Sequence, residues 1–166
     1  MEPSRERFWA VVSHSGSILS WAVMWYLTIL MWENPSPVIL FMRILPTAAI
    51  IPFLVWIFKG KENNFVGGQA KESLNFQISF YLYSIFIFIF LILLKYLIIF
   101  LWNIINPAIL NHEDNKSLIG YFLFGVFGFG SFRLFMVVNL IFSIIGSINA
   151  FKSTMYMYPI NLRLIK

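Results

Sequence analysis

A histidine near the start of the first long apolar stretch is the residue best suited to proton transfer or haem binding. His14 stands beside Ser13, Ser15 and Gly16, whereas the second histidine, His112, lies in a polar stretch far along the chain. Two axial haem ligands must meet at one depth, and these two are expected on opposite sides of a membrane. A hydrogen-bonded structural role for His14 is therefore favoured over a proton relay, and we expect no cofactor.

The other types of reactive residue show no catalytic pattern. His112, Glu113 and Asp114 are consecutive, which gives poor geometry for a metal, so we interpret them as a solvated turn. The chain has no cysteine, which excludes thiolate chemistry. Phosphate-binding, metalloprotease and nucleophile-elbow motifs are missing, and no carboxylate pair lies within an apolar stretch. We expect a protein that is not an enzyme and has no metal site.

Polar residues gather at the start of the third apolar stretch. At helical spacing Glu72, Asn75 and Ser79 share one face, and Gln77 lies on a second polar stripe. Packing against other helices is the favoured interpretation. A polar groove or docking surface open to the cytoplasm is the functional alternative. Its candidate residues are Lys71, Glu72, Asn75, Gln77 and Ser79.

Three basic residues fall within or beside apolar stretches and complete the intramembrane polar set with His14. They are Arg43, Lys95 and Arg133. Such side chains snorkel to the interface, bind lipid headgroups or form ion pairs, and snorkelling is favoured here. Acidic residues of the neighbouring loops are candidate partners: Glu33 for Arg43, and Glu113 or Asp114 for Lys95.

Small residues recur at helical spacing in the last apolar stretch. Ser143, Gly146, Ser147 and Ala150 form small-xxx-small pairs, which let two helices approach closely. Packing within the chain is the favoured role, and homodimerisation through this face is the alternative.

The composition shows which kind of element must carry these residues. Apolar residues make up 60% of the 166 and charged residues only 11%, against about 45–50% and about 25% in soluble domains. This composition argues against a soluble monomer. The net charge of +5 arises from few residues, so it indicates membrane orientation rather than nucleic-acid binding. The lipid bilayer is the expected partner.

Four apolar stretches are long enough to cross a bilayer, which takes about 20 residues. The sequence predicts an all-α, polytopic four-transmembrane-helix bundle that forms one membrane domain over residues 1–166. Its helices are expected at about 8–32, 38–58, 74–105 and 132–151, with a glycine-rich irregular or interfacial stretch at 118–131. The third stretch exceeds one bilayer core, so it projects, tilts or breaks near Lys95.

The distribution of lysine and arginine orients this bundle. Eight of the 12 basic residues fall in the N-terminus, the loop at 59–73 and the C-terminus, which share one side when there are four crossings. By the positive-inside rule both termini are cytoplasmic. We expect a multi-pass protein of the bacterial cytoplasmic membrane.

Two stretches carry a family resemblance. The first comprises Pro52 to Lys59, Phe65-Val66 and Gln69 to Ser79, with the core Lys71-Glu72-x-x-Asn75-Phe76-Gln77. The second comprises Ile144 to Ala150 and Tyr158 to Arg163. They resemble small prokaryotic membrane proteins of unknown function that are similar to a chloroplast inner-envelope translocon component, the Tic family. That resemblance implies four transmembrane helices. Gln69, Ser73 and Ser153 depart from its pattern, which has His, Ala and Gly there.

The leading hypothesis is a non-enzymatic, Tic-like subunit or accessory of a membrane complex, linked to protein translocation. Its partner would be another membrane protein or a second copy of the chain. A small channel or transporter whose polar stripe lines a vestibule is one alternative. An immunity protein against a membrane-active peptide is the other.

Overall fold

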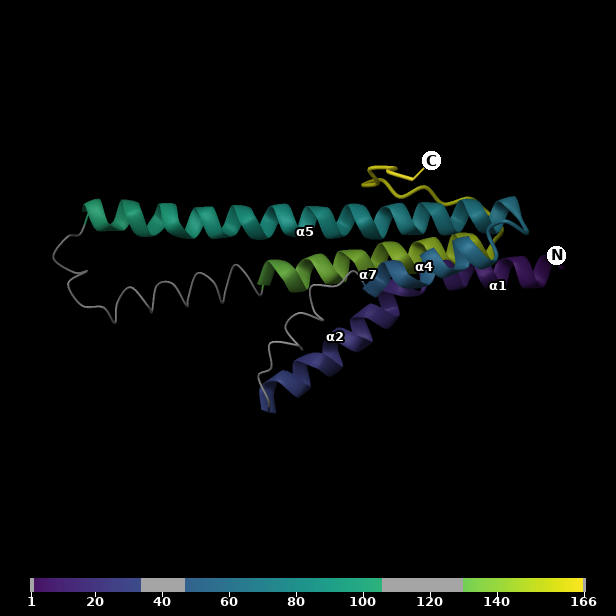
Figure 1. Ribbon diagram of the computed structural model, residues 1–166, viewed down its shortest axis with the longest axis horizontal. Helices are drawn as coiled ribbons and strands as arrows, with labels where there is room; N and C mark the ends of the chain where they lie inside the picture. The colour runs from purple at the N-terminus through teal and green to yellow at the C-terminus, as the bar shows by residue number, and fades with distance from the viewer. Residues whose placement is uncertain (1, 34–46, 106–129, 166) are drawn as a thin grey trace. The chain divides into compact units, whose positions relative to one another are not determined.

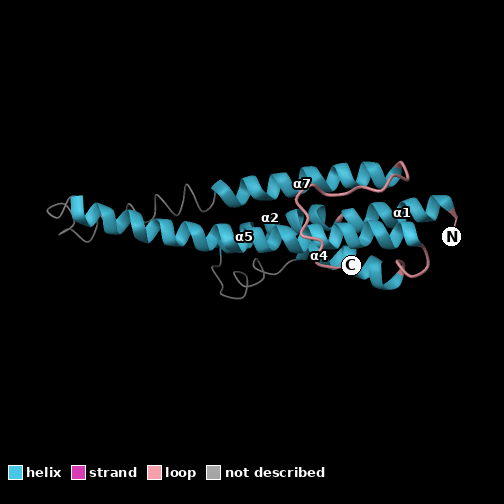
Figure 2. Ribbon diagram, turned by 90° about the horizontal axis from the view of Figure 1, so that it is seen from above, coloured by secondary structure: helices cyan, strands magenta, loops and turns pink. Residues whose placement is uncertain are grey.

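The computed structural model describes residues 2–33, 47–105 and 130–165, and the regular secondary structure of those residues is α-helical (Figures 1 and 2). In chain order the helices are α1 (Pro3–His14), α2 (Gly16–Glu33), α4 (Thr47–Phe58), α5 (Asn64–Ile105) and α7 (Gly130–Phe151). The predicted all-α class is confirmed over these residues. The chain divides into two compact units, residues 1–81 with 138–166 and residues 82–137. The single-domain organisation stays a prediction.

The first predicted crossing is divided into two helices at Ser15. Pro3 begins α1, where its missing N–H costs nothing, and the helix ends at His14. The Ser13 and Ser15 hydroxyls donate to the carbonyl oxygens of Ala10 and Val12, at 2.7 and 2.8 Å. Side-chain bonds of this kind bend a helix, and the break falls where they coincide with Gly16, which packs closely against α4. From there α2 runs at an angle to α1 (Figure 1).

A proline and a glycine shape the contact of α4 with this break. Pro52 lies inside α4 and has no N–H to donate to the carbonyl of Ala48, four residues earlier. Gly16, the first residue of α2, lies against that same region: a Cβ placed on it would clash with the Ala48 carbonyl oxygen. Only a residue without a side chain fits here. The predicted helix over 38–58 is described from Thr47 onward as α4, and residues 38–46 lie outside the described residues.

Helix α5 is the longest helix, with 42 residues. Asn63 caps it, since its Oδ1 atom accepts from the backbone N–H groups of Phe65 and Val66, at 2.8 and 3.1 Å. The helix starts ten residues before the predicted Leu74 and continues without a break through Lys95. It contains the one stretch, Asn64–Leu101, that is long and apolar enough to cross a membrane among the described residues. Shorter apolar helices are Gly16–Leu27, Thr47–Phe58 and Met136–Phe151.

Helix α7 begins two residues before the predicted Phe132 and ends at Phe151 as expected. Ser153 follows it with a left-handed φ of 60°. The backbone N–H of Ser153 donates to Ala150, and that of Thr154 donates to Asn149, both at 3.0 Å. This is a Schellman-type helix end. It turns the C-terminal segment, residues 152–165, back toward α5 (Figure 2). Of the predicted irregular stretch 118–131, only residues 130–131 are described, and they are helical.

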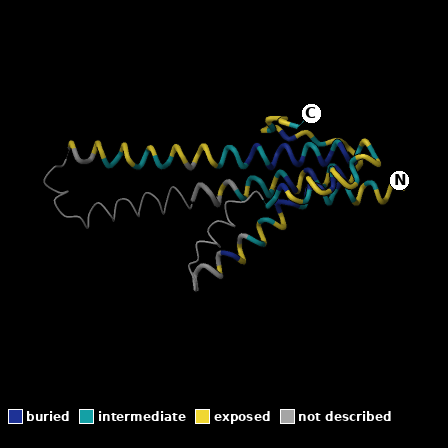
Figure 3. Tube along the Cα trace, in the orientation of Figure 1, coloured by how far each residue is buried: buried dark blue, intermediate teal, exposed yellow. Residues whose placement is uncertain are grey.

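Buried residues concentrate in the first unit (Figure 3). There α1, α4, α7 and the C-terminal segment surround the N-terminal part of α5. The fully buried side chains include Phe76, His14 and Gln69. A small apolar core of Val55, Val66 and Ala70 lies beside them. Much of this interior is polar, and these polar groups define the candidate site.

Candidate functional site

A chain of hydrogen bonds centred on His14 links three parts of the first unit. The Nε2 atom of His14 lies 2.9 Å from the side-chain oxygen of Gln69 on α5, and its Nδ1 atom lies 2.6 Å from the hydroxyl of Tyr158 in the C-terminal segment. The Gln69 amide nitrogen in turn donates to the carbonyl oxygen of Thr154 at 2.7 Å. The imidazole ring is fully buried. His14 therefore joins α1 to α5 and to the C-terminal segment.

The sequence of these hydrogen bonds determines which atom donates in each of them. The Thr154 carbonyl can only accept, so the Gln69 amide nitrogen faces it and the Gln69 oxygen faces His14. That oxygen also only accepts, so Nε2 of His14 carries the hydrogen. In the neutral ring Nδ1 is then an acceptor, and Tyr158 donates to it. Because an amide neither gains nor loses protons readily, the chain is suited to positioning rather than to relaying protons.

Tyr158 is held by stacking as well as by this bond. Its ring lies parallel to that of Phe76 on α5, with centroids 4.0 Å apart and planes 7° apart. Burial raises the pKa of the Tyr158 phenol above its ordinary value of 10, because the phenolate would lose its hydration. Burial also raises the pKa of Tyr156. The Tyr158 hydroxyl therefore remains a donor throughout the neutral range.

The small residues of α7 lie against this chain. A Cβ on Gly146 would lie 2.7 Å from the Tyr158 hydroxyl and 2.8 Å from Nδ1 of His14, so the glycine makes room for their hydrogen bond. Ser143 and Ala150 are fully buried in the same unit. The Ser147 hydroxyl donates to the Ser143 carbonyl of its own helix at 2.9 Å. These contacts lie within one chain, and the homodimer alternative stays a prediction.

Two amides form a second polar cluster between α5 and α7. The Asn139 amide donates to the Gln77 oxygen at 3.0 Å, and the Gln77 amide donates to the Asn139 oxygen at 3.3 Å. Ser17 of α2 donates to Asn139 and lies 2.6 Å from the Ser143 hydroxyl. The Gln77 amide also donates to Ser17 at 2.6 Å. Three helices are therefore joined by polar groups that satisfy one another.

The remaining polar residues of the predicted groove contact the C-terminal segment. Asn75 pairs with the backbone of Ile165 twice, donating to its carbonyl at 2.8 Å and accepting from its N–H at 2.7 Å. The Ser79 hydroxyl accepts from the Leu162 N–H at 2.9 Å. The Glu72 carboxylate accepts from Asn161 at 2.8 Å. These three side chains therefore bind the chain's own C-terminal segment. A docking role for them stays a prediction.

The other candidates are only partly described. The amino group of Lys71 lies 5.9 Å from the Trp56 ring centroid, and that of Lys95 lies 6.0 Å from the ring of Tyr96. Arg43 and the His112 loop lie outside the described residues, as does the side chain of Arg133. Over the part of the chain that is described, no group of three or more metal-ligating residues could hold a metal ion.

Sequence reasoning missed the partners of His14. Gln69 and Tyr158 were visible only as parts of the resembling stretches, because they lie 55 and 144 residues away in sequence. Ser17, in the first turn of α2, joins the cluster of Gln77 and Asn139, and nothing in its local spacing marked it. Asn161 belongs to the same resembling stretch as Tyr158, whereas nothing in the sequence marked Thr154, which acts from a segment without regular structure.

Comparison with known proteins contradicts the family resemblance that the sequence suggested. No curated protein and no solved structure matches the chain. The assignment to a Tic-like family is wrong, because the family model that matches residues 5–165 is a different one. The short motifs that suggested it cover about half of the chain, whereas this match covers nearly all of it. The chain belongs to the magnetosome magnetite crystal formation protein family, MamF/MmsF.

Proposed function

We propose that this chain is a non-enzymatic protein of the magnetosome membrane that takes part in magnetite crystal formation. The observation that carries the proposal is the family match over residues 5–165. The membrane character follows from the apolar composition and from the long apolar part of α5. The magnetosome membrane is the proposed location, in place of the cytoplasmic membrane in general.

The geometry of the polar interior supports a structural role. Both ring nitrogens of His14 are engaged by protein groups, and Gln69 and Gln77 are amides that hold neighbouring elements together. Groups used in this way position helices and do not transfer protons or electrons. The protein's contribution would then be the surface that it orders at the membrane, with the C-terminal segment held against α5.

The topology is part of the proposal. We place crossings at residues 16–33, within 38–58, along α5 and along α7, with both termini on the cytoplasmic side. The basic residues at both termini and in the loop after α4 support that side. Because α1 carries Arg5, Glu6 and Arg7, it enters the membrane only toward its C-terminal end. The partners would be the lipid bilayer and another membrane protein or a second copy of the chain.

A deletion in the host that encodes the chain tests the proposal. Loss of the protein is expected to change the size or number of magnetite crystals seen by electron microscopy, and the wild-type gene is expected to restore them. A fluorescent fusion should lie along the magnetosomes. Normal crystals in the deletion strain, with the fusion spread evenly over the cell membrane, would refute the proposal.

A matched pair of variants connects this test to the structure. Gly146→Leu places a side chain into the bond between His14 and Tyr158, whereas Ile144→Leu changes an exposed residue of the same helix. We expect only the first variant to fail in restoring crystals, at equal protein level by immunoblot. Equal rescue by both would show that the polar interior is not needed for crystal formation.

A further inference from the structure

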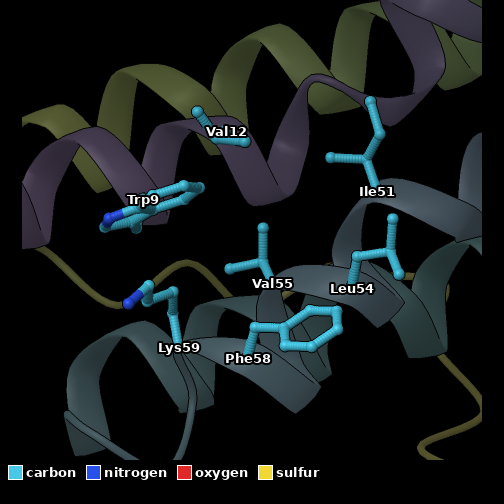
Figure 4. A pocket seen from close by; sticks show the side chains of 7 residues that line it. All are labelled: Trp9, Val12, Ile51, Leu54, Val55, Phe58 and Lys59. Atoms are coloured by element: carbon cyan, nitrogen blue, oxygen red, sulfur yellow. The ribbon is translucent and has the colours of Figure 1, made fainter.

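A groove between α1 and α4 combines an apolar wall with a basic end. It has a volume of about 410 Å³ and is lined by Trp9 and Val12 from α1, Leu54, Val55 and Phe58 from α4, and Lys59 just after α4 (Figure 4). Sites for small molecules span about 300–1,000 Å³. The groove lies within the first unit and shares no residue with the polar clusters around His14 and Gln77.

One polar atom of this groove is unsatisfied. The indole nitrogen of Trp9 is buried and has no hydrogen-bond partner, the one such side-chain atom found in the described residues. A buried N–H without an acceptor is costly, so an acceptor that reaches this atom would bind favourably. The Lys59 amino group lies 5.9 Å from the centroid of the Trp9 ring. Figure 4 shows the indole nitrogen and this amino group at the same end of the groove.

Charge indicates what kind of acceptor fits this end. Lys59 forms an ion pair with Glu62 at 2.8 Å, which uses one of the three N–H donors of the ammonium group and leaves two for another acceptor. An anionic oxygen placed beside Lys59 would accept from the ammonium group and, once the lysine side chain rotates, from the indole N–H. A phosphate offers several such oxygens.

The remainder of the groove indicates what is attached to that phosphate. Its wall is almost wholly apolar, and the neighbouring side chains of Phe8 and Phe58 are 59% and 67% exposed. Aromatic rings with a lysine at the end of an apolar helix are typical of the membrane–water interface. A hydrocarbon chain is the kind of group that suits such a wall.

We propose that the groove between α1 and α4 is a binding site for an anionic phospholipid. One acyl chain lies along Val12, Leu54 and Phe58, and the phosphate contacts Lys59 and the indole N–H of Trp9. Such a lipid would fix the ends of α1 and α4 at the cytoplasmic interface. The proposal concerns lipid binding alone and does not depend on a role in crystal formation.

Native mass spectrometry of the full chain in mild detergent tests the site. The probes are phosphatidylglycerol and, as a zwitterionic comparison with the same acyl chains, phosphatidylcholine. We expect phosphatidylglycerol to be retained more strongly. Lys59→Gln should weaken that retention about tenfold, as expected for one charged hydrogen bond. Lys61→Gln is the matched control, because Lys61 is exposed and does not line the groove.

Two further variants separate the headgroup from the acyl chain. Trp9→Phe keeps an aromatic ring but removes the N–H, and it should weaken retention of phosphatidylglycerol several-fold. Leu54→Trp fills the groove at a side chain that is 44% exposed, so it should weaken retention of both lipids without disturbing the fold. Helical circular dichroism and size-exclusion profiles check that each variant is folded.

Equal retention of the two lipids by the wild type would overturn the proposal, as would equal losses in Lys59→Gln and Lys61→Gln. A shift in oligomeric state in Leu54→Trp with unchanged lipid retention would assign the groove to a protein contact instead, and would also overturn it.

Discussion

The two halves of α5 have opposite surfaces. In the polar half, residues 64–81, the side chains of Gln69, Ser73 and Asn75 are at most 2% exposed. In the apolar half, residues 82–105, the side chains of Phe86 and Phe90 are 69% and 62% exposed. A water-soluble protein buries its apolar residues and exposes its polar ones. The reversal along one helix teaches that hydrogen bonds hold the polar half to its neighbours, while the apolar half has the exposed apolar surface expected of a membrane-crossing helix.

The largest loss of stability is expected at Gly16, which packs against the backbone of Ala48 in the first unit. Gly16→Ala places a methyl group against the Ala48 carbonyl oxygen, which is backbone and cannot move aside. We expect the free energy of unfolding to fall by about 3 kcal/mol, as in overpacked cores. The measurement is thermal unfolding in detergent, followed by circular dichroism.

Gly68→Ala is the control for this substitution. The added methyl group meets only the end of the Met155 side chain, which is flexible and 49% exposed. Since alanine also favours the helix, Gly68→Ala should leave the unfolding midpoint unchanged or raise it. Equal losses in the two variants would show that glycine itself, and not the contact with Ala48, determines stability.

A smaller loss is expected when the chain of bonds at His14 is interrupted. Tyr158→Phe keeps the stacking on Phe76 but leaves Nδ1 of His14 without its donor. An unsatisfied buried acceptor costs about 1–2 kcal/mol, and we expect the unfolding free energy to fall by that amount. Tyr156→Phe is the matched control at a less buried ring. If Tyr158→Phe is as stable as the wild type, the hydrogen bond positions the two rings but does not stabilise the fold.

The hydrogen bonds between α5 and the C-terminal segment are expected to contribute less to stability. Asn75→Ala removes both bonds to Ile165, so residues 161–165 should exchange their amide hydrogens faster by about tenfold, which corresponds to roughly 1.4 kcal/mol. Hydrogen exchange with mass spectrometry measures this. Asn64→Ala, at an exposed position of the same helix, should leave exchange unchanged. Unaltered exchange in Asn75→Ala would mean that other contacts hold the segment.

The sequence predicted the positions of the helices better than the contacts that their side chains make. The apolar stretches located α5 and α7 to within ten residues, because hydropathy is a local property. The break at Ser15 coincides with side-chain bonds to carbonyls one turn earlier and with the close packing of Gly16 on α4, both of which apolar counting ignores. The four-crossing bundle stays a prediction, since α5 has the one long apolar span among the residues described.

The candidate site was predicted only in part, for a similar reason. Helical spacing predicted Glu72, Asn75 and Ser79 on one face, and all three side chains contact the C-terminal segment. It could not reveal that the C-terminal segment lies on that face, because that contact joins residues 83 to 90 positions apart. Short motifs also suggested the wrong family. A motif of a few residues in apolar helices is constrained mostly by packing, so it carries little information about function.

The smallest effect is expected in the apolar half, where a paired substitution sharpens the contrast. Phe90→Leu changes a ring that is 62% exposed, and it should alter the unfolding free energy by less than about 0.5 kcal/mol. Phe76→Leu makes the same change at a fully buried ring that stacks on Tyr158, so it should cost about 1.5 kcal/mol. Thermal unfolding in detergent compares the two. If Phe90→Leu proves as costly as Phe76→Leu, the apolar half packs against protein rather than lipid, and the contrast between the halves fails.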